Sequence, residues 1–372
     1  MIVSRPRVCR PSGFTTVLFA LAAVLPPHAA AAQSEEVDRY IKAEMERQHI
    51  PGLSLLVARD GKILKQVSYG MASIEFGVPA TDSTLYQIAS ATKSFTAAAV
   101  MLLVQEGKFR TTDSVTRLLP GLPDHWGGVT VRHLLSHTSG LPDVLARPGF
   151  GPLLFTTRQA ALDSLPRLAV AAAPGEKWLY NQTNYLLLVD LVEKYGGESF
   201  QEFMRHRIFE PLGMRRTVFD SRAVVPGYTT HYEYEKGRLL RVINDVGIHP
   251  FLFGAAGIGT SAVELYWFAE SLRTHSLLNA KSVEEMWTPP VRNDSATVIS
   301  LGGFRFEYGY GFVVERQPGK RSVGHSGGGT AAFRIFPDDR MVVVVLHNGR
   351  TPNPDGLVFG VASKYNPKLA AP

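Results

Sequence analysis

The sequence contains almost no cysteine and carries little net charge, and both absences exclude classes of chemistry. Its 372 residues include one cysteine, Cys9, which lies in a segment that we expect to be removed. The mature protein would then have no disulfide and no thiol nucleophile. The formal net charge is +6, and loss of Arg5, Arg7 and Arg10 with that segment halves it. A charge this small does not favour nucleic acid or a membrane surface as a partner.

Recognisable metal motifs and repeats are also missing from the sequence. There is no H-E-x-x-H motif. His133 and His137 are four residues apart, but no third ligand is apparent, so we interpret them as a structural pair. We therefore expect no metal and no cofactor. After the first 32 residues, no apolar run is long enough to span a membrane.

The first 32 residues have the three regions of a secretory signal peptide. A basic start is followed by an apolar run from Phe14 to Leu25, which is short for a membrane span, and then by small residues at Ala30 to Ala32. We expect cleavage before Gln33, with an uncleaved anchor as the alternative. This predicts a periplasmic or secreted protein without a stable membrane anchor after cleavage.

The most apolar stretch of the mature chain runs from Phe95 to Val104. A helix with no polar face must be buried on every side, and Gly107 favours its termination. At the start of this helix, Ser90 and Lys93 are three residues apart, so they share one face. A desolvated lysine has a lowered pKa and can act as a base. The spacing is the S-x-x-K pattern of serine acyltransferases, although Ser90 could also be an ordinary N-cap.

The order of the remaining elements predicts an α+β fold. A helix with Ser34 as its N-cap is followed by strands at 53–59 and 62–69, joined by the turn Asp60–Gly61. Alternating aromatic residues after residue 300, and the apolar run Met341 to Leu346, predict further strands. We expect one antiparallel sheet built from both chain ends and flanked by helices, with an inserted mainly helical lobe. The predicted boundaries are a signal peptide at 1–32 and a domain at 33–366, with the α/β lobe at about 33–85 and 300–366 and the helical lobe at about 86–299.

Seven separated stretches resemble the serine beta-lactamase and penicillin-binding-protein superfamily. The likeness is greatest to class C beta-lactamases, D-alanyl-D-alanine carboxypeptidases and family VIII carboxylesterases. In chain order the stretches are IPGLSLLVARDGK, YQIASATKSFTAA, VRHLLSHTSGLP, PGEKWLYNQTNYLLL, FEPLGMRRTVF, GAAGIGTSAVELYWFAESL and GHSGGG. The resemblance implies that Ser90 is the acylated nucleophile and that Lys93 is its partner base.

The resemblance also assigns a tyrosine and an amide to the site. Tyr180 matches the tyrosine that opens the family's Tyr-x-Asn motif, and Gln182 stands where asparagine is usual. The glutamine offers the same amide on a longer stem, so we expect it to bind a substrate carbonyl. We also expect the closeness of Lys93 and Tyr180 to lower the pKa of both groups.

The last matching stretch supplies the strand beside the nucleophile. His325, Ser326 and Gly327 stand in the place of the Lys-Thr-Gly motif, and the N–H of Gly328 would form the oxyanion hole with that of the nucleophile. A histidine is mostly neutral at pH 7, so we expect weak selection for carboxylates and tolerance of neutral esters. Arg334 could bind a carboxylate instead, or could be a solvated arginine on a strand.

These residues imply a secreted serine hydrolase that acts through a Ser90 acyl-enzyme on an ester or amide. Carboxylesterase, D-Ala-D-Ala carboxypeptidase or other D-peptidase, and beta-lactamase-like activities all remain open. The partner would be a small-molecule or peptidoglycan-like acyl substrate. One alternative is a penicillin-binding sensor domain without turnover. Another is an alpha/beta-hydrolase that uses Ser326, within G-x-S-x-G and followed by Asp338 and His347. The sequence does not specify the oligomeric state or the group that activates the deacylating water.

Overall fold

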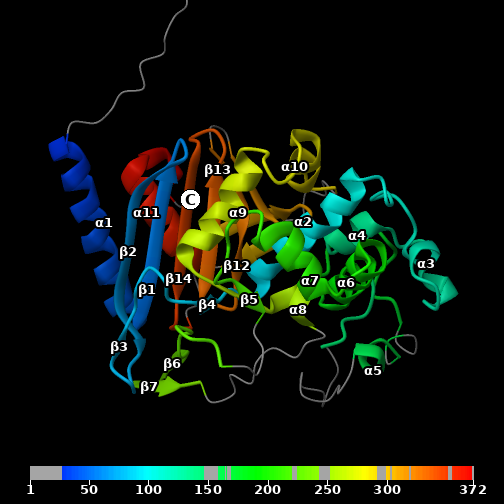
Figure 1. Cartoon of the computed structure of the whole chain (residues 1–372), viewed down its shortest axis with the longest axis horizontal. Coiled ribbons are helices and arrows are strands. Elements are labelled where there is room, and N and C mark those ends of the chain that lie inside the picture. The colour runs from blue at the N-terminus through cyan, green and yellow to red at the C-terminus, as the bar shows by residue number, and fades with distance from the viewer. Residues whose placement is uncertain are drawn as a thin grey trace, which may run out of the picture.

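The computed structural model describes most of the chain after the expected signal segment. The described residues are 27–145, 158–163, 165, 169–219, 224–242, 252–290, 299–301, 304–317, 320–350 and 354–370. Residues 1–26, which contain most of the expected signal peptide, lie outside them. In Figure 1, a central sheet is flanked by helices on one side, and a mainly helical region extends from its other side.

The central sheet is antiparallel and joins the two ends of the chain. Its strand order is β3 (Val78–Pro79), β2 (Lys62–Ser73), β1 (Gly52–Arg59), β14 (Met341–His347), β13 (Ala331–Phe336), β12 (Lys320–Gly327), β11 (Val313–Gln317), β10 (Phe304–Tyr308) and β9 (Ile299–Leu301). Strand β1 pairs with β14, and Leu55 lies opposite Val345. The expectation of one antiparallel sheet from both chain ends is confirmed.

Turn chemistry and burial explain why these strands form. Asp60 and Gly61 both have positive φ, 55° and 75°, as a two-residue hairpin turn of type I′ requires. Strand β14 is buried at every position, as expected of a central strand with helices on both faces. Its side chains alternate between two cores: Val343 packs with one cluster and Val344 with the other.

Helices cover both faces of the sheet (Figure 1). Helices α1 (Pro27–Gln48) and α11 (Pro354–Tyr365) lie on one face. Helices α2 (Thr92–Gln105) and α9 (Ala262–Arg273) belong to the core of the opposite face. Helix α2 also packs against α6 (Thr183–Gly196), so it lies between the sheet and the helical region.

The remaining elements build the helical region and its rim. They are the helices α3 (Val115–Leu118), α4 (Val131–Leu135), α5 (Arg158–Asp163), α7 (Phe200–Met204), α8 (Phe253–Ala256) and α10 (Ala280–Met286), and the strands β4 (Tyr86–Gln87), β5 (Val218–Phe219), β6 (Tyr232–Glu235), β7 (Arg238–Arg241) and β8 (Ile258–Thr260). A π-helical turn, Arg205–Phe209, follows α7. In the described part of the chain, no helix has both the length and the apolar character needed to cross a membrane.

The prediction that Ser34 caps the first helix is wrong. Helix α1 begins at Pro27, because proline suits the first turn of a helix and the alanines before Gln33 are strong helix formers. Ser34 instead accepts a hydrogen bond from Lys65 Nζ at 2.7 Å. Lys65 also pairs with Asp38 at 2.8 Å, so these contacts fasten α1 to β2.

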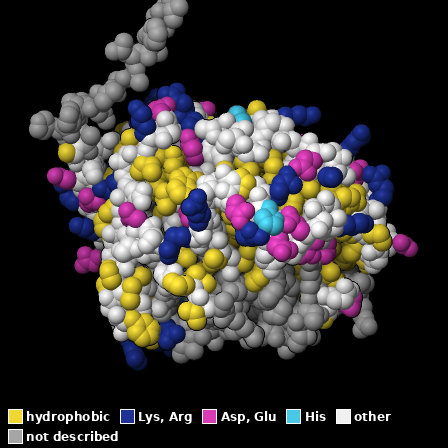
Figure 2. Space-filling view, viewed as in Figure 1, with side chains coloured by type: hydrophobic (Ala, Val, Ile, Leu, Met, Phe, Trp, Pro, Cys, Tyr) yellow, Lys and Arg dark blue, Asp and Glu magenta, His cyan; other side chains and the backbone are white. Residues whose placement is uncertain are grey.

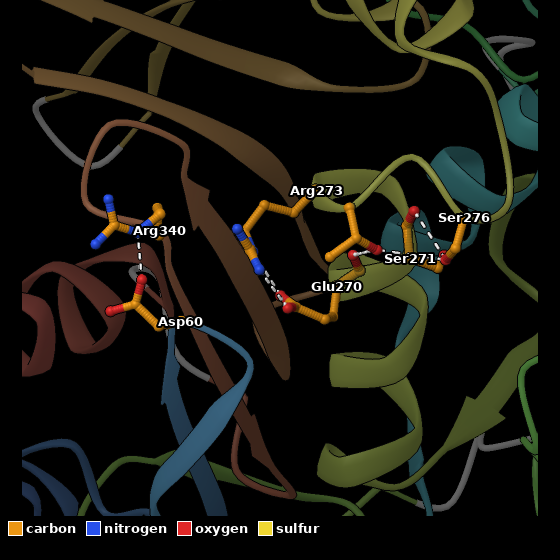
Figure 3. Close-up of polar contacts among 7 residues, drawn as sticks. Asp60, Glu270, Ser271, Arg273, Ser276 and Arg340 are labelled. Atoms are coloured by element: carbon orange, nitrogen blue, oxygen red, sulfur yellow. Dashed lines mark hydrogen bonds and ion pairs between the residues drawn. The ribbon is translucent and has the colours of Figure 1, made fainter. Parts of the chain in front are cut away.

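One ion pair at an end of the sheet joins two turns, and another lies within a neighbouring helix. Asp60, in the β1–β2 turn, accepts a hydrogen bond from Arg340 in the β13–β14 turn, while Glu270 and Arg273 pair at 2.5 Å on α9 (Figure 3). Charged side chains of both signs are spread over the face shown in Figure 2, with hydrophobic groups between them. The Asp60–Arg340 pair is exposed, so water screens its attraction.

Arg334 takes part in a buried ion pair, so it is neither a solvated arginine nor a ligand-binding one. Its side chain is fully buried and its Nη2 lies 2.7 Å from Asp355 Oδ1. The guanidinium also lies over the rings of Phe306 and Phe359, at 5.0 and 5.8 Å from their centroids. Both sequence-based interpretations of Arg334 are therefore wrong, since the sequence does not show that α11 brings a carboxylate to this face.

Replacing Asp355 by asparagine should destabilise the fold strongly. Asp355→Asn leaves the Arg334 guanidinium buried without a counterion, which typically costs about 3–5 kcal/mol. Urea unfolding followed by circular dichroism measures the loss in the free energy of unfolding. Asp60→Asn is the matched control, and it should leave the unfolding midpoint almost unchanged. Similar midpoints for the two variants would show that the buried pair contributes no more than the exposed one.

Candidate active site

The central buried helix forms as expected, but Ser90 lies just before it. Ser90 is the middle residue of a 3₁₀ turn, Ala89–Ala91, that continues directly into α2. Every residue of α2 from Thr92 to Leu103 is buried. Gly107, with a φ of 74°, ends the helix, and its N–H donates to the carbonyl of Val104. Ser90 itself is half-buried, so its hydroxyl lies at the edge of the core.

Lys93 is completely buried, and among the described residues its hydrogen bonds go to neutral oxygens. Its Nζ donates to Gln182 Oε1 at 2.9 Å and to the carbonyl of Ala255 at 2.8 Å. The amine also lies 4.8 Å from the centroid of the Tyr180 ring. Burial lowers the pKa of Lys93 to about 7, although the carboxylate of Asp143 acts in the opposite direction. Much of this lysine is therefore an uncharged amine near neutral pH.

Tyr180 lies beside Lys93, but its pKa does not respond as expected. Burial raises the pKa of Tyr180, and this effect outweighs the opposing interaction with the Ser90 side chain. Among the described residues, its hydroxyl has no hydrogen-bond partner of normal geometry. The expectation of a lowered pKa is confirmed for Lys93 and wrong for Tyr180, because a phenolate is poorly solvated in this position. Tyr180 is a neutral phenol at physiological pH.

The loop after α4 holds the Tyr180 segment in place. The carbonyl of His137 accepts a hydrogen bond from the N–H of Leu179 at 2.8 Å. His137 Nδ1 faces two donors, the N–H of Asn181 at 3.3 Å and Nδ2 of Asn184 at 3.1 Å. The imidazole also packs against Tyr180, with 4.2 Å between ring centroids. His137 thus fixes the position of the segment that carries Tyr180.

His133 and His137 serve separate structural purposes. His133 Nδ1 accepts from the N–H of Thr130 at the start of α4, whereas His137 binds the Tyr180 segment. Within the described ranges, no group of three or more His, Cys, Asp or Glu side chains could hold a metal ion.

Gln182 is fixed by hydrogen bonds of its side chain and of its backbone. Its side-chain oxygen accepts from Lys93, and its N–H donates to Asp143 Oδ1 at 3.2 Å. The residue is half-buried, so it reaches from the buried amine toward the surface.

The end of β12 lies directly against the 3₁₀ turn Ala89–Ala91, which carries Ser90 and is called the nucleophile turn below. A Cβ atom on Gly327 would come within 1.9 Å of the Ile88 carbonyl oxygen and 2.9 Å of the Ser90 nitrogen. Gly328 follows with a φ of 53°, and Ala89 has a φ of 41°. Both values lie in the left-handed region, which is unfavourable for alanine and easy for glycine. The Gly327 backbone therefore lies against those of Ile88 and Ser90, and Gly328 lies beside Ala89.

His325 faces the buried side of this strand. Its side chain lies beside the Tyr308 ring and the residue is 4% exposed, whereas Ser326 is half-buried and Gly328 is exposed. His325 Nδ1 lies 2.6 Å from the carbonyl oxygen of Ser326, and Nε2 lies 2.9 Å from the hydroxyl of Tyr308. Burial and the nearby Lys93 lower the pKa of His325 to about 3. The imidazole is therefore neutral at pH 7.

A family model described as Beta-lactamase matches residues 37–358. The chain belongs to the Beta-lactamase family. Among curated proteins, it is 32% identical over 316 residues to penicillin-binding protein 4* of Bacillus subtilis strain 168, covering 79% of this chain and 67% of that protein.

Solved structures of similar proteins share the fold of this Beta-lactamase family member. The octameric penicillin-binding protein homologue from Pyrococcus abyssi has a TM-score of 0.75 and 28% identity, covering 91% of this chain and 79% of that one. EstCE1, described as a hydrolase with promiscuous acyltransferase activity, also has a TM-score of 0.75, with 22% identity over 87% of this chain and 95% of its own. At that identity, EstCE1 supports the fold alone.

In this Beta-lactamase family member, Ser326 does not belong to a nucleophile elbow. It lies in β12, which turns into another strand rather than a helix. Asp338 is exposed in the β13–β14 turn. Ser326 pairs with Ala332 on the neighbouring strand. Asp338 comes six residues after Ala332, so it lies about 20 Å from this pair along the strand direction. His347 Nδ1 donates to the carbonyl of Gly349 at 2.7 Å. The alternative triad is therefore wrong.

Sequence reasoning missed three residues that shape this site. His137 and Asp143 flank a loop whose role depends on contacts with a segment some 40 residues later in the chain. Tyr308 was one of several alternating aromatics, and only the strand pairing shows that it meets His325. The family-like stretch VRHLLSHTSGLP did contain His137, but it gave no indication of its partner.

Adding a methyl group at Gly327 should disturb the nucleophile turn. In Gly327→Ala, the new Cβ clashes with backbone atoms of Ile88 and Ser90, so we expect the free energy of unfolding to fall by about 1–3 kcal/mol or more. Chemical denaturation measures this change. The control is Gly128→Ala, where the nearest atom would be a proline side-chain carbon at 3.6 Å. A Gly327→Ala protein as stable as the control would refute the close approach.

Proposed function

We propose that the protein is a serine hydrolase in which Ser90 attacks an ester or amide carbonyl and forms an acyl-enzyme. The observation that carries this proposal is the buried Lys93 amine, which has a pKa of about 7 and donates hydrogen bonds to two neutral oxygens. It follows the half-buried Ser90 by three residues. A serine hydroxyl is a weak nucleophile until a nearby base accepts its proton, and an uncharged amine is such a base.

In the proposed acylation step, Lys93 accepts the proton of Ser90 as the serine oxygen bonds to the carbonyl carbon. Tyr180 is a neutral phenol that interacts with Ser90, so it can donate a proton to the leaving group as the carbon–heteroatom bond breaks. The lysine then returns its proton to Tyr180. Proton and bond changes balance, and both groups regain their starting forms.

The developing oxyanion needs donors that are fixed before the reaction. We propose the N–H groups of Ser90 and Gly328, a choice supported by the close approach of the Gly327 backbone to the Ser90 turn, where a Cβ on Gly327 would lie 2.9 Å from the Ser90 nitrogen. One such donor typically contributes about 2.7–4 kcal/mol to transition-state stabilisation. The Gln182 oxygen is held by Lys93, which leaves its NH₂ group to bind a carbonyl of the substrate.

We base the proposed substrate class on the family and on the absence of a charge on the His325 imidazole. Membership of the Beta-lactamase family and the likeness to penicillin-binding proteins favour a small acyl donor or a peptidoglycan-like peptide. The neutral His325 favours donors without a carboxylate. Secretion to the periplasm or the medium, from the expected signal peptide, is part of the same proposal.

Separate replacement of the two candidate serines tests the nucleophile. Ser90→Ala should lower kcat for a chromogenic ester by about 10³-fold or more, as removal of a nucleophile does in other serine hydrolases. Ser326→Ala should retain a covalent acyl adduct, located at Ser90 by peptide mapping. An adduct on Ser326 would overturn the assignment. A single equivalent of product without further turnover would indicate the sensor alternative.

The pH dependence of kcat/KM should report the Lys93 amine. Only the uncharged amine accepts a proton, so the rate on a neutral ester should rise with pH and level off above about 7. In Asp143→Asn, loss of the carboxylate that favours the charged amine should move the inflection to lower pH. An unchanged inflection in Asp143→Asn, or one near 10, would contradict the role of Lys93.

A further inference from the structure

Asp143 is a half-buried carboxylate beside the substrate-binding residues of the candidate site. Its Oδ1 accepts hydrogen bonds from the N–H groups of Gln182, at 3.2 Å, and Leu145, at 3.1 Å. The N–H of Val144 donates to Thr183 Oγ1 at 2.9 Å, so this loop lies against the start of α6. The carboxylate is therefore held next to the glutamine that we propose to bind a substrate carbonyl.

The second oxygen of this carboxylate is available to a ligand. Both hydrogen bonds of Asp143 go to Oδ1. In the described ranges, Oδ2 has no hydrogen-bond partner and is not buried. No lysine or arginine of those ranges forms an ion pair with Asp143, so its charge is not neutralised by a neighbouring side chain.

The other ionisable groups near the site do not compensate this negative charge. Asp143 acts on the Lys93 amine, which has a pKa of about 7 and is mostly uncharged at pH 8. His325 is neutral there, because its pKa is lowered to about 3. Arg334, which acts on His325, is paired with Asp355 at 2.7 Å. These described groups together give the site a negative charge located at Asp143.

We propose that Asp143 is a specificity-determining residue that favours acyl donors with an ammonium group in the acyl part. The ammonium charge would lie beside Oδ2 while the Gln182 NH₂ binds a carbonyl and Ser90 attacks. This inference rests on the proposed hydrolase function and names its substrate class. A neutral His325 gives no attraction for an anion, whereas Asp143 supplies an attraction for a cation.

Substrates with a fixed charge test this preference. We compare 4-nitrophenyl esters whose acyl chain ends in a trimethylammonium group with esters that carry an uncharged tert-butyl group of the same shape, for a short and a long chain. At pH 8, Asp143→Asn should lower the charged-to-neutral ratio of kcat/KM on the order of tenfold, for the chain length that the wild type prefers. Asparagine keeps an oxygen for both N–H donors, and any change at Lys93 affects both esters equally.

Asp338→Asn is the matched control. It removes a carboxylate of the same size from the exposed β13–β14 turn, away from the candidate site. The charged-to-neutral ratio should stay at the wild-type value in this variant. An unchanged ratio in Asp143→Asn, or an equal fall in Asp338→Asn, would overturn the proposal.

Two measurements on proteins that keep Asp143 decide the matter if Asp143→Asn does not fold. Added salt should lower wild-type kcat/KM more for the charged ester than for its neutral isostere, because ions screen the attraction. Calorimetry of Ser90→Ala with the corresponding amides should show the same difference in binding. Equal salt effects on the charged and neutral compounds would overturn this inference. If no ester is hydrolysed but calorimetry shows the difference, the proposed function fails instead.

Discussion

The burial of the Lys93 amine determines its own protonation state and affects those of the groups around it. Lys93 lies on a helix that is buried on every side, and its two hydrogen-bond acceptors are an amide and a backbone carbonyl. A cation in such surroundings loses most of its hydration, so the proton is released near neutral pH. Burial of α2 therefore also lowers the pKa of Lys93 enough for it to be the base that the proposed chemistry requires.

The neighbours of Lys93 respond to the same lack of water. His137 and His325 are both buried, and in each case burial and the charge of Lys93 lower the pKa of the imidazole. Tyr180 keeps its proton for the same reason, because burial disfavours the phenolate. The cluster thus combines one amine that titrates near pH 7 with neutral groups that hold their hydrogen bonds across the physiological range.

This arrangement has a thermodynamic cost to the fold. In an unfolded chain, a lysine titrates near 10.4, whereas the pKa of folded Lys93 is about 7. Between these values the unfolded chain binds a proton that the folded protein does not, so the free energy of unfolding rises with pH across that window. Below about pH 7 the full penalty is present. Tight packing of α2 and the paired strands must offset it.

The sequence predicted the features that depend on local pattern, and it failed where distant segments meet. The buried helix, the Asp60–Gly61 hairpin and the central strand followed from periodicity and turn residues. The predicted start of α1 at Ser34 was wrong, because the alanines before Gln33 favour a helix that begins at Pro27. Arg334 was misread because its partner, Asp355, comes from another element. The contact of Tyr308 with His325 depends on the register of the sheet, which no local signal encodes.

The most direct test of the account is the protonation state of Lys93 itself. Nitrogen-15 NMR of the lysine side chains, with Lys93 assigned by its absence in Lys93→Met, can follow the amine through a pH titration. The account predicts a midpoint near pH 7. A midpoint close to 10.4, the value of a solvated lysine, would show that the amine stays charged at neutral pH and cannot be the base.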